Sequence, residues 1–415
     1  MVIETRPRPA PISEIDVLNE ANECTTDRSV DTKPLSAERA FAFWQKDIPE
    51  EYWSLGGEEL RDRIALARAK LGERCVVLGH HYQREDIIQF ADYKGDSFNL
   101  SRWAAEKQDV EYIVFCGVHF MAESADILSA PHQKVILPNM SAGCSMADMA
   151  DPEDVYACWD ELVEAGFADP DGQVVPVTYM NSAAALKAFC GKNGGIVCTS
   201  SNAPKVYDWA LEGGSKVLFF PDQHLGRNTG LKKGISLDEM VVWDYSLPYG
   251  SLGGNTREQL ERAKVILWRG WCSVHRRFSV AQIEKARREH PDPDGQAVTV
   301  IVHPECTMEV VQAADMDGST EFITKTITNA PAGSTWAVGT EINLVSRLAR
   351  ENPDKTVFCL DPVVCPCATM YRIHPAYLCW ALEELAEGRV VNQVEVDEET
   401  ARHAKVALER MLSVR

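Results

Sequence analysis

The stretch KVILPNMSAGC, Lys134–Cys144, joins an apolar run to a short loop that ends in a cysteine. Two later stretches end in the same way: KVILWRGWC, Lys264–Cys272, and TVFCLDPVVCPC, Thr356–Cys367. Short apolar runs of this kind predict strands that are buried on both faces. Ligands bind at the carboxyl ends of parallel strands, so the repeated ending favours three α/β units that each deliver one cysteine. Buried cysteines that follow strands by chance explain the spacing about equally well.

Seven more apolar runs separate or precede these stretches, with helical patterns between them. They begin at Cys75, Tyr112, Pro176, Ile196, Lys216, Val298 and Thr335. One helical pattern covers residues 58–71, and Gly72 suits its C-terminal end. Its apolar positions are Leu60, Ile64, Leu66, Ala67 and Leu71. Strands that alternate with helices predict mostly parallel sheets. The longer interval between the cysteines predicts an insertion near residues 229–255, which is rich in Gly and lacks strand alternation.

The composition is that of a globular chain, with 415 residues, 45% hydrophobic and 25% charged. A formal net charge of −20 argues against nucleic acid or an anionic membrane surface as the main partner, but permits a small anionic substrate. Because the chain has no run of 18 apolar residues, we expect no membrane span. Thirteen cysteines without a secretion signal indicate a reducing cytoplasm. Residues 1–35 predict a polar tail with few buried contacts.

Polar residues gather where the predicted strands end, whereas the sequence lacks the common signatures of nucleotide-binding loops, zinc proteases and serine hydrolases. The clusters are His80-His-Tyr-Gln83, Gly95-Asp-Ser97, Tyr179-Met-Asn181, Cys198-Thr-Ser-Ser-Asn202, Asp222-Gln-His224, Cys272-Ser-Val-His275, His303-Pro-Glu-Cys306, Gly318-Ser-Thr320 and Gly339-Thr-Glu341. Hydroxyls and backbone N–H groups at helix starts bind carboxylate or phosphate, and His and Glu transfer protons near neutral pH. For any one hydroxyl, helix capping is an equally good account.

Seven motifs, in order along about Cys75 to Glu384, resemble the quinolinate synthase family. They are CGVHFMAESA (Cys116–Ala125), LPNMSAGCSMAD (Leu137–Asp148), CTSSNA (Cys198–Ala203), PDQHLGRN (Pro221–Asn228), WRGWCSVHRRF (Trp268–Phe278), HPECTMEVVQAADMDGST (His303–Thr320) and CPCATM (Cys365–Met370). The N-terminal segment to about Trp53 and the insertion lie outside the pattern. His81 departs from it, because the family commonly has Asn or Tyr there.

The resemblance implies an α/β fold of three pseudo-threefold-related three-layer αβα domains, with mostly parallel sheets around a central cluster site. We expect a domain from residues 56–145 plus 368–415, a second from 146–272 and a third from 273–367, after an N-terminal extension of residues 1–55. The implied reaction condenses iminoaspartate with dihydroxyacetone phosphate to quinolinate, phosphate and water in de novo NAD synthesis. The implied partner in the pathway is an aspartate-oxidising enzyme.

The resemblance also implies a [4Fe–4S] cluster held by Cys144, Cys272 and Cys367. Three protein thiolates leave one iron open, and an open iron acts as a Lewis acid. Cys365 lies two residues from Cys367, so a ligand swap or a redox disulfide remains open. A different Cys/His metal-dependent lyase or aldolase, or a non-enzymatic iron–sulfur sensor, are the alternative functions.

The same resemblance assigns roles to residues at the strand ends. Catalytic roles fall to His80, Tyr82, His275 and Glu305. Substrate-binding roles fall to His80, Ser97, Tyr179, Asn181, Ser200, His303, Glu305, Ser319 and Thr320. Glu305 is the expected general base, with a pKa that partial burial would move toward neutrality. The alternatives are a satisfied core pair for His80 and Tyr82, a surface ion pair for Glu305 and a partner to a cluster sulfide for His275.

Overall fold

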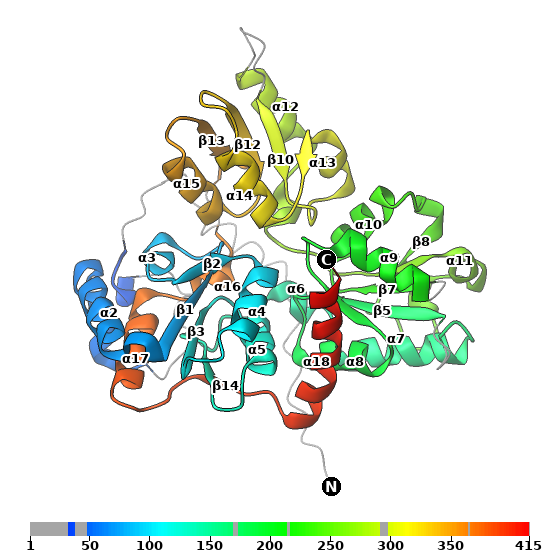
Figure 1. Ribbon diagram of the computed structural model, residues 1–415. Coiled ribbons are helices and arrows are strands. Elements are labelled where there is room, and N and C mark those ends of the chain that lie inside the picture. The colour runs from blue at the N-terminus through cyan, green and yellow to red at the C-terminus, as the bar shows by residue number, and fades with distance from the viewer. Residues whose placement is uncertain are drawn as a thin grey trace.

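The computed structural model describes residues 32–37, 48–168, 173–213, 216–290, 298–363 and 366–414. Its strands form three separate sheets, and Figure 1 shows the three α/β units grouped around a common centre. The α/β class with three mostly parallel sheets is therefore confirmed. Most buried apolar side chains of the first two units form one continuous core, and the third unit has smaller apolar clusters on the two faces of its own sheet.

The first sheet has the spatial order β14-β4-β3-β1-β2, and all its neighbours pair in parallel except β14 with β4. Its strands are β1 Cys75–His80, β2 Tyr93–Gly95, β3 Tyr112–Cys116, β4 Lys134–Ile136 and β14 Gln393–Val394. The helices that follow these strands or lie beside them are α2 Gly57–Leu71, α3 Glu85–Ile88, α4 Ser97–Glu106, α5 His119–Leu128, α6 Ser145–Asp148, α16 Ala368–Tyr371 and α17 Pro375–Ala386.

The second sheet has the order β6-β5-β7-β9-β8 and is parallel throughout. Its strands are β5 Val174–Tyr179, β6 Ile196–Cys198, β7 Lys216–Phe220, β8 Met240–Trp243 and β9 Val265–Trp268. Its helices are α7 Pro152–Glu164, α8 Ala184–Lys192, α9 Ala203–Gly213, α10 Gln223–Lys232, α11 Arg257–Arg262 and α18 Glu398–Ser413.

The third sheet is parallel and has the order β11-β10-β12-β13. Its strands are β10 Thr299–Val302, β11 Met316–Asp317, β12 Thr335–Gly339 and β13 Thr356–Cys359. Its helices are α12 Val280–Glu289, α13 Met308–Ala313, α14 Thr320–Thr328 and α15 Ile342–Glu351. Single 3₁₀ turns occur at Leu35–Ala37, Glu50–Tyr52, Gly72–Arg74, Leu237–Glu239, Leu252–Gly254 and His275–Arg277.

The three sheets repeat one strand order. Counted along the chain without the inserted strand β8, the second strand of each unit lies beside the first, followed by the third and the fourth: β2-β1-β3-β4, β6-β5-β7-β9 and β11-β10-β12-β13. Additional strands attach only beyond the fourth strand, as β14 does in the first sheet and β8 in the second. Each of the three predicted cysteines follows the fourth strand of its unit. Equivalent strands therefore carry equivalent residues toward the centre.

The expected insertion near residues 229–255 contains a strand, contrary to the sequence analysis. Residues 229–232 belong to α10, and Met240–Trp243 form β8, which pairs with β9 at the edge of the sheet. Every second residue of β8 is buried, because only one of its faces packs on the unit. The insertion thus extends the second sheet outward and leaves β9, which precedes Cys272, in its place.

The C-terminal helix α18 packs mainly on the second unit, although the expected first domain of residues 56–145 plus 368–415 includes it. Helix α17 packs on α2 and β14 pairs with β4, as that division requires. Helix α18 instead packs along α8 and β6 of the second unit, which Figure 1 shows beside it. Its buried face of Ala404, Ala407, Leu408 and Met411 is what holds it there.

The start of the described chain is more firmly packed than a polar tail. Leu35 is fully buried, Thr32 donates to Asp86 and the Lys33 carbonyl lies 3.0 Å from Nε2 of His374. This corrects the expectation of few buried contacts for residues 32–35, because one apolar side chain anchors the segment. Most of the 1–55 extension lies outside the described residues. Helix α2 forms as predicted, with Gly72 at a φ of 54° after its last residue, although Leu66 is 65% exposed.

Candidate active site

A cavity opens where the three units meet, and twelve of the fourteen predicted site residues line it. These twelve are His80, Tyr82, Ser97, Cys144, Tyr179, Asn181, Ser200, Cys272, His303, Glu305, Thr320 and Cys367. The two that do not line it are His275 and Ser319.

The first strand of every unit ends in a pair of polar residues spaced two apart. After β1 the pair is His80 and Tyr82, and at the end of β5 it is Tyr179 and Asn181. After β10 the third pair is His303 and Glu305, with the same spacing, and all six side chains face the one cavity. Three equivalent strand ends therefore supply the groups capable of proton transfer and hydrogen bonding.

The second strand of every unit is followed by a hydroxyl at or near the start of a helix. Ser97 is the first residue of α4, Ser200 precedes α9 and Thr320 is the first residue of α14. All three line the cavity. Free backbone N–H groups at helix starts favour anions, so these positions suit carboxylate or phosphate.

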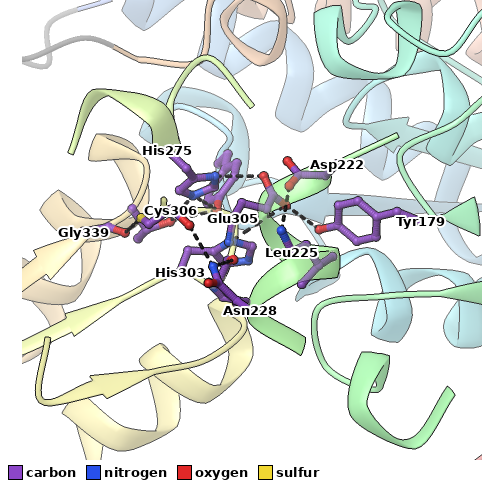
Figure 2. Close-up of polar contacts among 12 residues, drawn as sticks. Tyr179, Asp222, Leu225, Asn228, His275, His303, Glu305, Cys306 and Gly339 are labelled. Atoms are coloured by element: carbon purple, nitrogen blue, oxygen red, sulfur yellow. Dashed lines mark hydrogen bonds and ion pairs between the residues drawn. The ribbon is translucent and has the colours of Figure 1, made fainter. Parts of the chain in front are cut away.

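Glu305 lies at the centre of a buried hydrogen-bond network that joins the second and third units (Figure 2). Its Oε1 is 2.6 Å from the Tyr179 hydroxyl, and its Oε2 is 2.9 Å from Nδ1 of His275. A carboxylate only accepts hydrogen bonds, so Tyr179 and His275 donate. The surface ion pair considered for Glu305 is excluded, because the side chain is 3% exposed.

The pKa of Glu305 moves in the direction opposite to the sequence expectation. Burial raises it, but the electrostatic interactions with His275 and His303 and the hydrogen bonds from His275 and Tyr179 outweigh burial and lower the pKa to about 2. The group is therefore held as the carboxylate, which is the form that accepts a proton.

His80 and His303 are fixed in the same tautomer. The Tyr82 N–H lies 3.1 Å from Nδ1 of His80, and the Glu305 N–H lies 3.3 Å from Nδ1 of His303. Burial is the main cause that holds the pKa of His80 well below its usual range and lowers that of His303 to about 3. Both rings are thus neutral, with Nδ1 accepting, and the proton is on Nε2.

His275 lies behind the cavity wall and bonds to residues that line it. Its ring stacks on His303 at 4.4 Å between centroids, and its Nε2 is 3.3 Å from the Tyr82 hydroxyl and 3.1 Å from the Thr340 hydroxyl. Both ring nitrogens are occupied, since Nδ1 binds Glu305. His275 therefore links Glu305 to Tyr82 through one ring.

Ser319 has a hydrogen-bond partner within the protein for its side-chain oxygen, whereas the side-chain oxygen of Asn181 has none. Ser319 caps α14, where its hydroxyl accepts from the Phe322 N–H at 3.2 Å, so capping occupies the group expected to bind substrate. Asn181 lines the cavity, and its Oδ1 is buried with no protein partner. A buried unpaired amide oxygen is costly unless a ligand or water satisfies it.

The three cysteines share one local geometry. Cys144 precedes α6, Cys367 precedes α16 and Cys272 precedes the turn at His275–Arg277. In each case the backbone N–H three residues on, at Ala147, His275 and Met370, lowers the pKa of the thiol. Burial is the larger effect and raises all three values, and Cys367 also raises the pKa of Cys144 and of Cys272. The three sulfurs are thus close together, and none is in a disulfide.

A second group of metal-type ligands overlaps this one. Sγ of Cys272 and ligand atoms of His275 and Glu305 lie within 4.8 Å of one another. However, His275 and Glu305 are already hydrogen-bonded to each other, and each has a further partner. A single ion at this point would have to break that network.

Sequence reasoning assigned no role to four residues of the centre. Thr340 contacts Tyr82 and His275, Asp96 caps α4 beside Ser97, and Thr369 lies 3.4 Å from Sγ of Cys367. Asp222 is fully buried beside Glu305. Thr340, Asp96 and Asp222 stand in the polar clusters at strand ends, which was the available signal. Cys365 lies outside the described residues.

The family model described as quinolinate synthetase A protein matches residues 62–413. The chain belongs to the quinolinate synthase family. A quinolinate synthase of Corynebacterium glutamicum is 60% identical over 89% of this chain and 91% of its own length. Quinolinate synthases of a Nocardioides species and of Herpetosiphon aurantiacus are 58% and 56% identical, over 86% and 88% of this chain and 89% and 95% of their own lengths.

Membership of the quinolinate synthase family makes the chain an enzyme and agrees with the resemblance drawn from its motifs. The match spans all three units and every predicted site residue. Across the described part of the chain, no helix combines the length and apolar character needed to span a bilayer.

Proposed function

We propose that the chain condenses iminoaspartate with dihydroxyacetone phosphate to give quinolinate, phosphate and two waters, as a transferase of de novo NAD synthesis. The observation that carries this proposal is the convergence of three polar pairs and three thiols on one cavity. Both substrates are small anions, and the reaction needs carboxylate and phosphate binding together with carbon-bound proton removal. The cavity offers helix starts for the first requirement and Glu305 for the second.

The metal component of the proposal is a [4Fe–4S] cluster bound by Cys144, Cys272 and Cys367. The residues fit it, because three partly buried thiols, which are soft donors once deprotonated, line one cavity, and each follows a strand and precedes a turn or helix start. With three ligands, the cluster would supply an open iron that polarises a substrate oxygen. Cys365 has no place in this ligand set.

The chain's own residues have distinct tasks. Ser97, Ser200 and Thr320 bind the anionic groups of the substrates, and Asn181 turns its unpaired Oδ1 to a substrate donor. His80 and His303 donate from Nε2. Glu305 takes the carbon-bound proton, since it starts as the carboxylate. Tyr179 and His275 hold the two oxygens of Glu305, so both are positioning groups for it.

Tyr82 completes the arrangement on the side of the first unit. Its hydroxyl is 2.8 Å from that of Thr340, and burial keeps the pKa of Tyr82 well above its usual range. The group is therefore a proton donor that lines the cavity. Tyr82 can therefore donate the proton with which a substrate hydroxyl leaves as water, while Glu305 removes a proton on the opposite side of the cavity.

Two alternative functions can be distinguished from the proposed one by experiment. A single-metal lyase or aldolase would use Cys272, His275 and Glu305, but this leaves Cys144 and Cys367 without a function. A non-enzymatic iron–sulfur sensor would need no set of proton-transfer groups around its cluster. The site has three such sets, which favours catalysis.

The deciding experiment is anaerobic purification followed by iron, sulfide and zinc analysis, visible absorption and a quinolinate assay. About four irons and four sulfides per chain, a brown colour and quinolinate formed from the two substrates are expected. Zinc in a colourless active protein would support the lyase reading. A brown protein that forms no quinolinate would support the sensor.

We further propose a cytoplasmic location and a functional link to an aspartate-oxidising enzyme, because iminoaspartate is unstable and must be made where it is used. We also propose domain boundaries near residues 145, 272 and 367, since each of these lies at the cysteine loop that ends a unit.

A further inference from the structure

The turns that follow the third strand of each unit hold the loops that carry the cysteines. In the first unit, the His119 N–H, at the start of α5, donates to the Ala142 carbonyl at 2.7 Å. In the second, the Gln223 N–H, at the start of α10, donates to the Gly270 carbonyl at 3.0 Å. Both acceptors stand two residues before a cysteine, Cys144 or Cys272. The contact is therefore a repeated feature of the architecture.

In the second and third units, the residue before that helix is a fully buried carboxylate. Asp222 caps α10, where its Oδ1 accepts from the Leu225 N–H at 2.7 Å. Glu341 caps α15, where its Oε2 accepts from the Asn343 N–H at 2.7 Å. The equivalent residue of the first unit is Val118, which has no polar side chain. Two of three equivalent positions thus carry a buried charge-bearing group.

Both residues lie against a cysteine loop, Glu341 through its side chain and Asp222 through its backbone. Oε1 of Glu341 accepts from the Cys367 N–H at 3.2 Å. Oδ2 of Asp222 has no hydrogen-bond partner, and the loop before Cys272 is held instead by the Gln223 N–H, at the start of the helix that Asp222 caps. Asp222 also pairs with Gly270 in an isolated parallel bridge, so the loop before Cys272 lies against it.

In the second unit, the backbone at Gly270 packs directly against the backbone at Pro221. A Cβ added to Gly270 would lie 2.3 Å from the Pro221 carbonyl oxygen, so the two backbones are in direct contact. A buried carboxylate that binds both a helix start and a neighbouring loop fixes the distance between them. Capping alone would need neither complete burial nor a second acceptor.

We propose that Asp222 and Glu341 are positioning residues that fix Cys272 and Cys367, respectively, in the geometry for metal binding, whereas the loop of Cys144 has no carboxylate at the equivalent position. The contacts of Asp222 and Glu341 are those of the described residues. Only the identity of the metal group rests on the proposed function.

The test is site-specific alkylation of the metal-free full-length chain, read by mass spectrometry at each of the three cysteines. Asp222→Ala should raise the rate at Cys272, and Glu341→Ala the rate at Cys367, by about tenfold relative to Cys144 in the same sample. Asp222→Asn and Glu341→Gln keep one acceptor oxygen and should give smaller increases at the same cysteine. If circular dichroism shows that the alanine variants do not fold, the amide variants Asp222→Asn and Glu341→Gln are used in their place.

Controls are Asp151→Ala and Asp397→Ala, which remove the exposed caps of α7 and α18 and contact no cysteine loop. They should leave all three rates unchanged. An equal rise at all three cysteines in the Asp222 and Glu341 variants, or no rise, would overturn the proposal, because a purely structural role predicts no selectivity.

The second readout is the half-time of iron loss to a chelator from the loaded protein, with the visible spectrum recorded throughout. Both amide variants should lose iron about tenfold faster than wild type at unchanged melting temperature, and an unchanged half-time would count against the proposal. If wild type binds no iron, the proposed cluster fails, but the alkylation experiment still decides the roles of Asp222 and Glu341.

Discussion

Nδ1 of His275 lies 2.9 Å from Oε2 of Glu305, and both side chains are almost completely buried. The two residues come from separate segments of the chain, since Glu305 follows β10 whereas His275 lies in the turn after Cys272. This pair holds the carboxylate in its ionised form and orients it beside the three thiols. Its consequences can be measured.

Glu305→Gln should retain iron and substrate binding and lose turnover by about 10²–10⁴-fold, the usual effect of removing a general base. A glutamine keeps the size of the side chain but cannot take a proton. The assay is quinolinate formed per minute by iron-replete protein. Glu161→Gln, a buried carboxylate that accepts from the Leu252 N–H away from the cavity, is the matched control and should keep its rate. Near wild-type turnover in Glu305→Gln would remove the residue from the mechanism.

Cys144→Ala, Cys272→Ala and Cys367→Ala should each abolish iron binding, because each removes one of three ligands. Cys158→Ala and Cys190→Ala remove buried thiols that do not line the cavity, and they should keep full iron content. Cys365→Ala should also keep it. Iron per chain after anaerobic reconstitution is the measurement, and a full complement in Cys367→Ala with none in Cys365→Ala would reverse the assignment.

His81→Ala should destabilise the chain by about 1–3 kcal/mol, because it leaves part of a buried guanidinium without its acceptor. His81 lies in the first unit, and its Nδ1 is 3.1 Å from Nη2 of Arg347 in the third, whose Nη1 is already unpaired. His81→Asn offers a replacement acceptor and should recover much of the loss. Urea unfolding compares the two variants, and equal stability of His81→Ala and wild type would contradict the argument.

His374 should make the chain sensitive to acid. Burial lowers its pKa to about 3, the charge of Arg84 adds to the effect, and Asp86 opposes it. Its Nδ1 accepts from the Ala376 N–H, so protonation would break the cap of α17. Because the unfolded residue binds a proton near its usual pKa of about 6.5, stability is retained above that pH and lost as the pH falls toward 3.

The slope from this group can reach about 1.4 kcal/mol per pH unit. His374→Asn keeps a capping oxygen without titrating in this range, so its stability should fall less steeply with acid. Urea unfolding between pH 7 and 4 gives the two slopes. His132→Asn, which changes an exposed histidine, is the control and should retain the wild-type slope. Parallel curves for His374→Asn and wild type would refute this source of acid sensitivity.

The ten strands expected from apolar runs all form, and the four that were missed, β2, β8, β11 and β14, lie at sheet edges. Strands β2, β11 and β14 have only two or three residues and so show no apolar run, whereas the apolar run of β8, Met240–Trp243, lay inside the segment interpreted as an insertion. Likewise, α18 has an amphipathic pattern that predicts a helix but does not say which unit it packs on. Partner choice depends on long-range contacts that local periodicity does not encode.

The site was largely accessible from sequence because its residues follow strands. His80, Tyr179 and His303 each stand at the end of a first strand, where chemistry in parallel sheets is expected. The direction of the Glu305 pKa could not be foreseen, because it depends on His275, which lies 30 residues earlier in the chain. The capping role of Ser319 and the second contacts of Asp222 and Glu341 also required coordinates.

Strand β8 attaches to the side of β9 that faces away from the rest of its sheet, and the following residues 246–250 are exposed. Extra residues can therefore be added at the outer edge of the second sheet without shifting the loop that carries Cys272. Foreign sequence spliced into residues 246–250, such as an affinity handle or a fluorescent reporter, would project from the flank of the second unit. The position is therefore suited to labelling or immobilising the enzyme with its centre intact.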